Sequence, residues 1–319
     1  MTQVYINVIL DFVNYIANSK GDFKMAFRII TDSASDLPAS VKEEYGVYVM
    51  PTPVTIDGKD YFDGDTIFPE EFYKIQAEGT HDIKTYHISQ YMFEEHFKKF
   101  AEAGDDVLDI GFSTGIAGTF QAANLAMQAV KEEYPDFDIT IIDSKCASIG
   151  YGLVVENICK MQRNGAPKEL IIEAAKFFCE HMEHVIIVKT LDYLHKGGRV
   201  GKVSFVVGGM LDIKPIIVVD ENGALKPIEK ARGWKRAQAR LVEMVGERGK
   251  GLSGQTIGVV YGADRDDLDD LKKELKTKYK VKDFLETQIG CAIGAHTGPE
   301  ILAATFLNET THKFNKYLK

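Results

Sequence analysis

From Phe27 onward the chain alternates short apolar runs with amphipathic runs, and this alternation most limits the folds open to it. Residues 27–33, 106–112 and 138–144 are apolar runs with the length of buried strands. Amphipathic runs with the spacing of helices that pack on one face lie between them. Parallel strands need a crossover connection, usually a helix, so this order predicts a parallel sheet covered on both faces.

The pattern changes after residues 167–184, which we interpret as one long amphipathic helix. Beyond this helix strand-like runs dominate, and only two or three helices are expected among them. A chain of 319 residues is long enough for two hydrophobic cores. We therefore predict an α/β domain at 27–183 and a second α/β domain at 184–319, the latter with a more mixed sheet.

Residues 1–26 are predicted to form a helical extension before the first domain. Its apolar side chains share one helical face, and they are Val8, Ile9, Phe12, Val13 and Ile16. The segment has no basic start and no small-residue cleavage site, and polar residues interrupt its apolar run. It is therefore expected to pack on protein, and it has the properties of neither a signal peptide nor a membrane span.

Composition argues against several classes of function. The net charge of −9 disfavours general nucleic-acid binding, because the phosphate backbone would be repelled. The cysteines form no C-x-x-C pair and have the scatter of reduced thiols, at Cys146, Cys159, Cys179 and Cys291. Together these features predict a cytoplasmic protein without stable membrane insertion.

Nucleotide-binding motifs are also missing. A P-loop needs G-x-x-x-x-G-K followed by Ser or Thr, because the lysine and the hydroxyl serve phosphate and magnesium. In "GKGLSGQT" Lys250 precedes Gly251, and in "GGRVGKVS" Lys202 precedes Val203. The turn after the first strand reads "TDSASD", without the glycines of a dinucleotide fingerprint. No nucleotide cofactor is therefore expected.

Catalytic and metal motifs are weak as well. "GFSTG" does not have the G-x-S-x-G spacing of a hydrolase elbow, although a Ser113–His296 pair stays conceivable in space. "CEHMEH" offers Cys179, His181 and His184, which we interpret as a solvated helix end, so no metal site is predicted. "ADRDDLDDL" lacks the spacing of a calcium loop and is predicted to begin a helix, with Asp264 as its cap.

Several turns at predicted strand ends are rich in glycine and small hydroxyl residues. They read "TDSASD", "KTYHIS", "FSTGIAGT" and "DSKCASIGYG", and "IGCAIGAHTGPE" follows near the C-terminus. Ligands of open α/β sheets bind at the carboxyl ends of the strands, where these turns fall. The turns offer hydrogen-bond donors without a strong acid–base pair, which favours a neutral site for one carboxylate with His296 nearby.

From Phe27 to about Leu307 the sequence resembles the DegV family. "ITDSASDLP" is similar to its opening I-T-D-S-x-x-D-L-P, and "STGIAGTFQAA" is similar to S-S-x-L-S-G-T-Y-Q-x-A. "KTYHIS" takes the place of T-S-Q-P-S, and "DSKCASIGYG" takes that of D-S-x-x-x-S-x-G-x-G. "LDYLHKGGRVG", "MLDIKPII" and "IGCAIGAHTGP" complete the set in the family's order.

The resemblance implies a three-layer α/β/α parallel-sheet domain followed by a two-layer α/β domain with a mixed sheet. It also implies a protein that is not itself an enzyme and that binds a long-chain fatty acid between its domains. Hydroxyl groups would hold the carboxylate. Such proteins present the fatty acid to a separate fatty acid kinase, which makes an acyl phosphate for phospholipid synthesis, and the family needs no cofactor.

The resemblance carries over to particular positions. The expected ligand-binding residues are Thr85, Ser89, Ser113, Thr114, Ala117, Gly118, Thr119 and His296. The expected kinase-docking residues are Arg199, Arg232 and Lys235. Two departures stand out, because Ala117 replaces the serine of L-S-G-T and His87 lies in the altered "KTYHIS" segment. They leave open a second hypothesis, a shifted amphiphilic ligand, beside the third, a hydrolase using Ser113 and His296.

Overall fold

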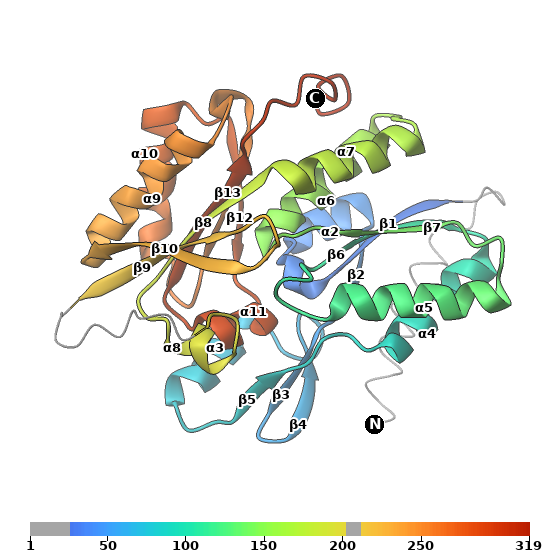
Figure 1. Cartoon of the computed structure of the whole chain (residues 1–319), viewed down its shortest axis with the longest axis horizontal. Helices are drawn as coiled ribbons and strands as arrows, with labels where there is room; N and C mark the ends of the chain where they lie inside the picture. Colours follow the sequence, from blue (N-terminus) through green and yellow to red (C-terminus); the bar gives the residue numbers. More distant parts are fainter. Residues whose placement is uncertain (1–25, 202–211) are drawn as a thin grey trace.

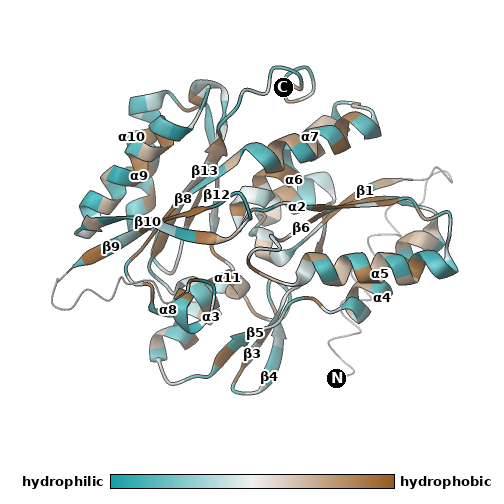
Figure 2. Ribbon diagram, viewed as in Figure 1, coloured by the Kyte–Doolittle hydropathy of each residue, from teal (hydrophilic) through white to brown (hydrophobic). Residues whose placement is uncertain are grey.

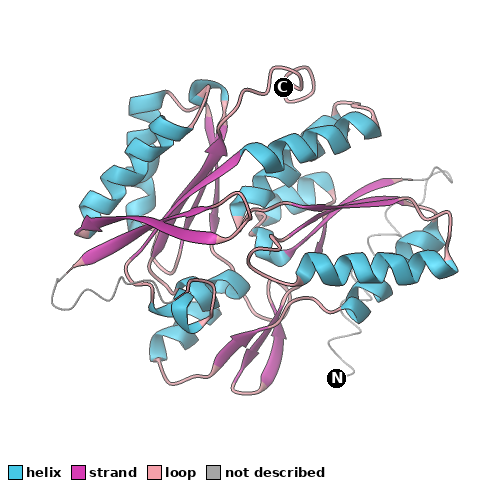
Figure 3. Cartoon of the chain, in the orientation of Figure 1, coloured by secondary structure: helices cyan, strands magenta, loops and turns pink. Residues whose placement is uncertain are grey.

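The computed structural model describes residues 26–201 and 212–319, and it confirms the predicted α/β class with two large sheets (Figure 1). The predicted helical extension lies, apart from Ala26, outside the described residues. Figure 3 shows helices packed around both sheets, and Figure 2 shows hydrophobic stretches on the strands of both large sheets and a mainly hydrophilic α10. None of the helices in the described ranges has the length and hydropathy that a membrane span needs.

The first sheet is parallel, with the order β2-β1-β6-β7. Its strands are β1 (Phe27–Asp32), β2 (Tyr48–Met50), β6 (Asp106–Gly111) and β7 (Ile139–Asp143). The short helices η1 (Ser33–Ser35) and α2 (Ala39–Tyr45) connect β1 to β2. The larger helices that pack on this sheet are α4 (Gln90–Ala103), α5 (Thr119–Glu133), α6 (Ile149–Arg163) and α7 (Lys168–His181). We call this sheet with its helices the first unit, and the second sheet with its helices the second unit.

Helices cover both faces of this sheet, as the alternation of strands and helices predicted. Ile30 of β1 packs with Phe97 of α4 and Ala126 of α5 in one apolar cluster. Its neighbour Ile29 points to the opposite face and belongs to the cluster that contains Phe178 of α7. Successive residues of a strand face opposite sides, so one apolar run supplies both cores.

The second sheet is mixed, with the order β10-β9-β8-β13-β11-β12. Only β11 and β12 pair in parallel, and the other pairs are antiparallel. Its strands are β8 (Met182–Val188), β9 (Ile213–Val219), β10 (Leu225–Arg232), β11 (Thr256–Tyr261), β12 (Asp283–Gln288) and β13 (Ile301–Leu307). Helices α9 (Trp234–Arg248) and α10 (Asp266–Tyr279) cover one face, and η2 (Leu252–Gly254) precedes β11.

The other face of the second sheet is turned toward the first unit. Val185 and Ile187 of β8 pack in the cluster formed with α9 and α10. Ile186 and Val188 belong instead to a cluster that contains Ile149 of α6. The alternation of side chains along β8 therefore places two packed layers on opposite sides of this sheet.

A third, small antiparallel sheet was not predicted. It has the order β4-β3-β5 and consists of β3 (Pro53–Ile56), β4 (Lys59–Phe62) and β5 (Ile83–Thr85), with α3 (Pro69–Glu78) before β5. Residues 47–56 have the sequence "VYVMPTPVTI", which is typical of one edge strand because of its two prolines, but they form two strands. The chain breaks between Met50 and Pro53, so β2 joins the edge of the parallel sheet while β3 starts the small sheet.

The expected helix over residues 167–184 was also too long. Helix α7 ends at His181, and β8 begins at Met182. Met182 and His184 are paired with Leu307 and Thr305 of β13, so the backbone here belongs to the sheet ladder. His184 is therefore a buried strand residue and does not lie at a solvated helix end.

The C-terminal tail returns to the first unit after β13. Leu307 and Phe314 belong to the same apolar cluster as Phe178 of α7. The ring of Phe314 lies 5.3 Å from that of Phe177 and 5.6 Å from that of Phe178, centroid to centroid. The first core is thus completed by the last residues of the chain, whose end lies near α7 in Figure 1.

Candidate ligand-binding site

A narrow cavity lies between the inward face of the second sheet and the first unit. The space open to the centre of a water-sized sphere is about 80 Å³. Much of its wall is aliphatic, with residues that include Ile116, Ile186, Ile217, Val260, Ile293 and Ile301. Because many residues line so small a volume, the cavity is slender, and it suits a flexible hydrocarbon chain better than a bulky ligand.

One end of the cavity is formed by β5, by α11 (Cys291–Thr297) and by α8 (Asp192–Lys196) with the residues after it. Here Thr85 Oγ1 lies 2.6 Å from His296 Nε2. Burial and the nearby charge of Arg199 lower the pKa of His296 to about 4, so its imidazole is neutral near pH 7. Its Nδ1 has no hydrogen-bond partner within the described part of the chain.

Gly197 makes room for this histidine. A Cβ on Gly197 would lie 2.1 Å from His296 Nδ1, which is closer than side chains pack. The glycine of the "KGGR" segment therefore has a spatial role beside the site. This contact joins α8 and α11, which supply the two walls of the same end.

Arg199 also lines this end of the cavity, although its expected role was kinase docking. Its Nε donates to the carbonyl oxygen of Ile116 at 3.3 Å, and Nη1 donates to that of Gly197 at 2.5 Å. Desolvation lowers the pKa of this half-buried guanidinium below its usual range. Among the described residues no carboxylate forms an ion pair with Arg199, so its charge is available to an anionic ligand.

The turn rich in glycine and hydroxyl residues before α5, residues 112–119, has some side chains that line the cavity and others that hydrogen-bond within the protein. Ala117 and Thr119 line the cavity. Ser113 is buried, and its hydroxyl donates to the carbonyl oxygen of Gly223 at 2.7 Å. The Thr114 hydroxyl donates to Asp143 Oδ2 at 2.6 Å. These two hydroxyls stabilise the turn and its contact with the second unit.

Two other predicted ligand-binding residues lie outside the cavity. Ser89 is exposed and caps α4, where its Oγ accepts the backbone N–H of Met92 at 3.3 Å. Gly118 lies under the ring of His87, and a Cβ there would be 3.5 Å from His87 Cγ. Ser89, Thr114 and Gly118 line a more open surface hollow. Ala117 and Arg199 line both spaces, so they form the boundary between the hollow and the cavity.

The pair that a serine hydrolase would use is not formed. Ser113 Oγ donates to Gly223, and it accepts the backbone N–H of Gly115 at 3.2 Å. His296 Nε2 is engaged by Thr85 instead. A general base must lie within hydrogen-bond reach of the nucleophile, and these side chains point to different partners.

Buried carboxylates from the first unit hold the start of α11, which carries His296. Asp63 accepts the backbone N–H groups of Cys291 at 2.9 Å and Ala292 at 3.1 Å. Asp36 accepts the N–H of Gly290 at 2.8 Å. Burial raises the pKa of both carboxyls above the ordinary range, partly offset by these hydrogen bonds. The position of His296 is therefore fixed through contacts with the segments that follow β1 and β4.

The sequence analysis missed two polar residues deeper in the cavity. His184 of β8 and Thr305 of β13 both line it and are both buried. The available signal was the alternation of Met182, His184, Ile186 and Val188, which places His184 on the same strand face as two aliphatic residues. Treating these residues as part of a helix hid that signal.

The weak metal motifs do not form clusters. Within the described residues no group of three His, Cys, Asp or Glu side chains is placed to hold an ion. His181 lies 2.9 Å from Asn308 Oδ1, whereas His184 is on the next strand.

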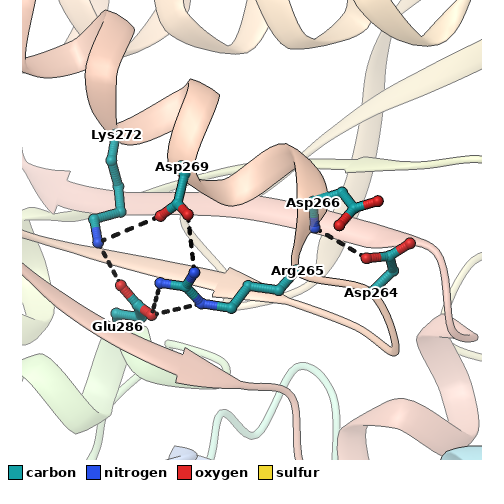
Figure 4. Close-up of polar contacts among 6 residues, drawn as sticks. All are labelled: Asp264, Arg265, Asp266, Asp269, Lys272 and Glu286. Carbon is teal, nitrogen blue, oxygen red and sulfur yellow. Dashed lines mark hydrogen bonds and ion pairs between the residues drawn. The ribbon is translucent and has the colours of Figure 1, made fainter.

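The acidic residues at the start of α10 form hydrogen bonds and ion pairs with neighbouring residues of the protein (Figure 4). Arg265 pairs with Asp269 at 2.9 Å and with Glu286 at 2.5 Å, and Lys272 also pairs with Glu286. The N-cap of α10 is Arg265, so the prediction of Asp264 as the cap was wrong by one residue, although Asp264 Oδ1 accepts the N–H of Asp266, the first helical residue, at 3.0 Å. Asp269 and Glu286 are therefore paired with cations of the same unit.

The other two predicted docking residues lie on the second unit. Arg232 ends β10 and is exposed. Lys235, at the start of α9, is exposed and lies 3.5 Å from Asp267 and 3.7 Å from Asp270. Part of its charge is therefore balanced locally.

Comparison with known proteins identifies relatives along nearly the whole chain. Residues 26–309 match the family described as "Uncharacterised protein, DegV family". A DegV domain-containing protein of Caldanaerobacter subterraneus subsp. tengcongensis is 32% identical over 278 residues, which cover 87% of this chain and 97% of that protein. One from Clostridium perfringens is 32% identical over 286 residues, or 89% and 98%.

Solved structures agree with these sequence matches. A DegV family protein from Thermus thermophilus, described as fatty acid binding, superimposes with a TM-score of 0.80 at 28% identity, covering 89% of this chain and all 100% of that one. A stearic acid-binding protein from Eubacterium ventriosum gives a TM-score of 0.81 at 26% identity, covering 88% and 98%.

Proposed function

Because the chain belongs to the DegV family, we propose that it binds one long-chain fatty acid, with the hydrocarbon chain inside the cavity between its two units. The observation that carries this proposal is the slender aliphatic cavity with a cation, Arg199, at one end. The proposed division between the units lies near residues 183 and 184, inside the start of β8 (Met182–Val188). The structural relatives from Thermus thermophilus and Eubacterium ventriosum are fatty acid-binding proteins, which supports the same ligand class.

Hydrocarbon burial supplies most of the affinity in this proposal. Removing about 15 methylene groups from water contributes roughly 12 kcal/mol, at about 0.8 kcal/mol each, before the costs of ordering and association. A hydrogen bond to a carboxylate contributes about 1.5–3 kcal/mol. The tail therefore determines whether the ligand binds, and the head group determines its orientation.

The carboxylate is assigned to the end formed by Thr85, His296 and Arg199. The Thr85 hydroxyl and the Arg199 guanidinium both donate hydrogen bonds, and the first N–H groups of α5 add a favourable dipole. Ala117 provides no hydroxyl at this boundary, so the assigned head-group contacts come from the other donors. Ser113, Thr114 and Ser89 support the surrounding turns and caps.

This proposal is tested on protein purified from a heterologous host. Denatured protein is extracted and analysed by mass spectrometry, and delipidated protein is titrated with stearic acid by calorimetry. We expect co-purified fatty acids and one site per chain. Absence of lipid in the extract together with no binding by the delipidated protein would refute the proposal.

A finer part of the proposal is presentation of the fatty acid to a separate cytoplasmic kinase. The open hollow beside Ala117 and Arg199 would give such a partner access to the carboxylate. Arg232 and Lys235 would contribute cationic contacts from the second unit. The test is acyl-phosphate formation by a bacterial fatty acid kinase supplied with the loaded protein, with Arg232→Ala as the variant. A rate unaffected by Arg232→Ala at limiting protein concentration would exclude that residue from docking.

A further inference from the structure

Two buried polar residues on neighbouring strands line the deep part of the cavity. His184 of β8 and Thr305 of β13 are direct cross-strand partners in the antiparallel ladder. Each residue is only 2% exposed, and both line the cavity. Directly opposed residues of antiparallel strands have Cβ atoms about 4.5–5.5 Å apart, so a ligand group that passes over the two strands comes within reach of both side chains, with the Thr305 hydroxyl on the β11 side.

Both side chains have an unused polar atom. Within the described part of the chain, His184 Nδ1 and Thr305 Oγ1 have no hydrogen-bond partner. Buried polar groups in folded proteins are nearly always paired, and leaving two of them unpaired in an aliphatic cavity is unfavourable. An occupant that pairs with both atoms removes this cost.

Glycines make room for the pair. A Cβ on Gly150 would lie 2.0 Å from His184 Nε2, and a Cβ on Gly258 would lie 2.3 Å from Thr305 Oγ1. The imidazole and the hydroxyl therefore occupy space left by the absence of side chains on α6 and β11. The polar pair is thus built into the packing of the two units.

The hydrogen-bonding capacity of the pair selects the group that fits. His184 Nε2 lies 3.3 Å from both the nitrogen and the oxygen of Ala147, so either tautomer is satisfied there. Burial lowers the pKa of His184 to about 4, so near pH 7 the ring is neutral and Nδ1 either donates or accepts. Thr305 can also do both. A hydroxyl group, which donates and accepts, complements the pair in either tautomer.

The pair is far from the proposed carboxylate end. Ile301, Ala303 and Thr305 line the cavity in succession along β13. Ile301 begins β13 five residues after His296, so it lies near the end that holds His296 and Arg199. At about 3.3 Å per residue, Thr305 is about 13 Å farther along the strand. A group bound there belongs to the hydrocarbon part of the ligand.

We propose that the preferred ligand is a fatty acid with a hydroxyl group on its hydrocarbon chain, and that His184 Nδ1 and Thr305 Oγ1 bind this hydroxyl. The inference rests on the proposed fatty-acid function and names its substrate class more narrowly. The carboxylate end and the hydroxyl pair together fix the ligand at two points along the cavity.

The test compares delipidated protein titrated with stearic acid and with octadecanoic acids that carry one hydroxyl at the tenth, twelfth or last carbon. Several positions are used because the carbon that meets the pair depends on how the tail bends. We expect at least one hydroxylated acid to bind about tenfold more tightly than stearic acid, since each hydrogen bond contributes about 0.5–1.5 kcal/mol. The hydroxylated isomers whose hydroxyl does not reach the pair should bind more weakly than stearic acid, because they bury an unpaired hydroxyl.

Thr305→Val removes one member of the pair while keeping the branched shape that suits a strand. Its preference for the best hydroxylated acid is expected to fall to about threefold or less, and the ligand-free variant should melt at a higher temperature than the parent. Thr31→Val is the matched control, because the Thr31 hydroxyl is also buried but donates to Ile110 O at 2.8 Å. The control should melt at a lower temperature and keep the preference.

Each outcome separates the two proposals. Binding of stearic acid as tightly as every hydroxylated acid overturns this inference, with water then the partner of the pair, and leaves fatty-acid binding intact. A preference that Thr305→Val does not change also overturns it. Absence of binding by all four acids refutes the proposed function itself.

Discussion

Arg199 is expected to contribute to affinity through the charge of the ligand's head group. The Arg199→Met substitution removes the guanidinium and keeps much of the apolar stem. In the protein the guanidinium lines the cavity end, donates to two backbone carbonyls and has no ion pair with a described carboxylate. The substitution should therefore weaken binding of fatty acids while leaving the aliphatic walls in place.

The expected size of the effect follows from the position of the side chain. A hydrogen bond to a charged group contributes about 1.5–3 kcal/mol, and half-burial places Arg199 at the lower part of that range because solvent screens the interaction. A loss of about 1.5–2 kcal/mol corresponds to a 10- to 30-fold rise in Kd, at roughly 1.4 kcal/mol per tenfold.

The assay compares a fatty acid with the fatty alcohol of the same chain length, each titrated against parent and variant by calorimetry. The acid should lose the full 10- to 30-fold and the alcohol about threefold or less, because an alcohol has no charge for Arg199 to neutralise. Lys235→Met is the matched control, since it removes an exposed cation that lies 3.5 Å from Asp267. Equal losses for acid and alcohol would mean that Arg199 acts through packing alone, and the head-group assignment would be refuted.

Three further predictions concern other parts of the site and the core. Ala117→Ser should lower the Kd of stearic acid about three- to tenfold, measured by calorimetry, because it adds a donor at the boundary of the cavity; an unchanged Kd would place the carboxylate elsewhere. Burial raises the pKa of Asp32 from its ordinary 3.8 to about 6, so the folded state holds a proton that the unfolded chain releases between these values. The resulting stability is complete below pH of about 3.8 and is lost as pH rises through about 6. The free energy of unfolding of the parent relative to Asp32→Asn should therefore rise by about 2–2.5 kcal/mol from pH 7 to about pH 4 in urea titrations, and a flat difference would contradict the assignment. Phe314→Ala should reduce the free energy of unfolding by about 3–5 kcal/mol, because the ring is only 2% exposed; a loss below about 1 kcal/mol would show that the tail is not part of the core.

The regular part of the fold could be predicted from local sequence patterns. The strands before and after α5 are mostly apolar, and the helices between strands have one apolar face, so the parallel sheet could be predicted from the spacing of these runs. The small sheet was missed because β3, β4 and β5 are only 3–4 residues long and carry no sustained alternation. Such short strands are stabilised by neighbours that are distant in the sequence.

The sequence predicted which types of residue lie near the site, but it did not predict how their side chains are arranged. Thr85 and His296 were both expected to bind the ligand, but their contact joins residues 211 positions apart, which no local pattern encodes. Ser113 and Thr114 have the same residue types as ligand donors, yet their hydroxyls are satisfied by Gly223 and Asp143. Tertiary contacts determine which hydroxyl is hydrogen-bonded within the protein and which one lines the cavity.

The return of the C-terminal tail to α7 has a consequence for biosynthesis. Phe177 and Phe178 leave the ribosome long before Phe314, the ring that covers them. The apolar surface of α7 therefore stays uncovered while the second unit is translated. Domains generally fold as units during synthesis, but the core of the first unit cannot be completed before Phe314 has been made. The core of the first unit is therefore completed only after the segment that follows β13 has been synthesised.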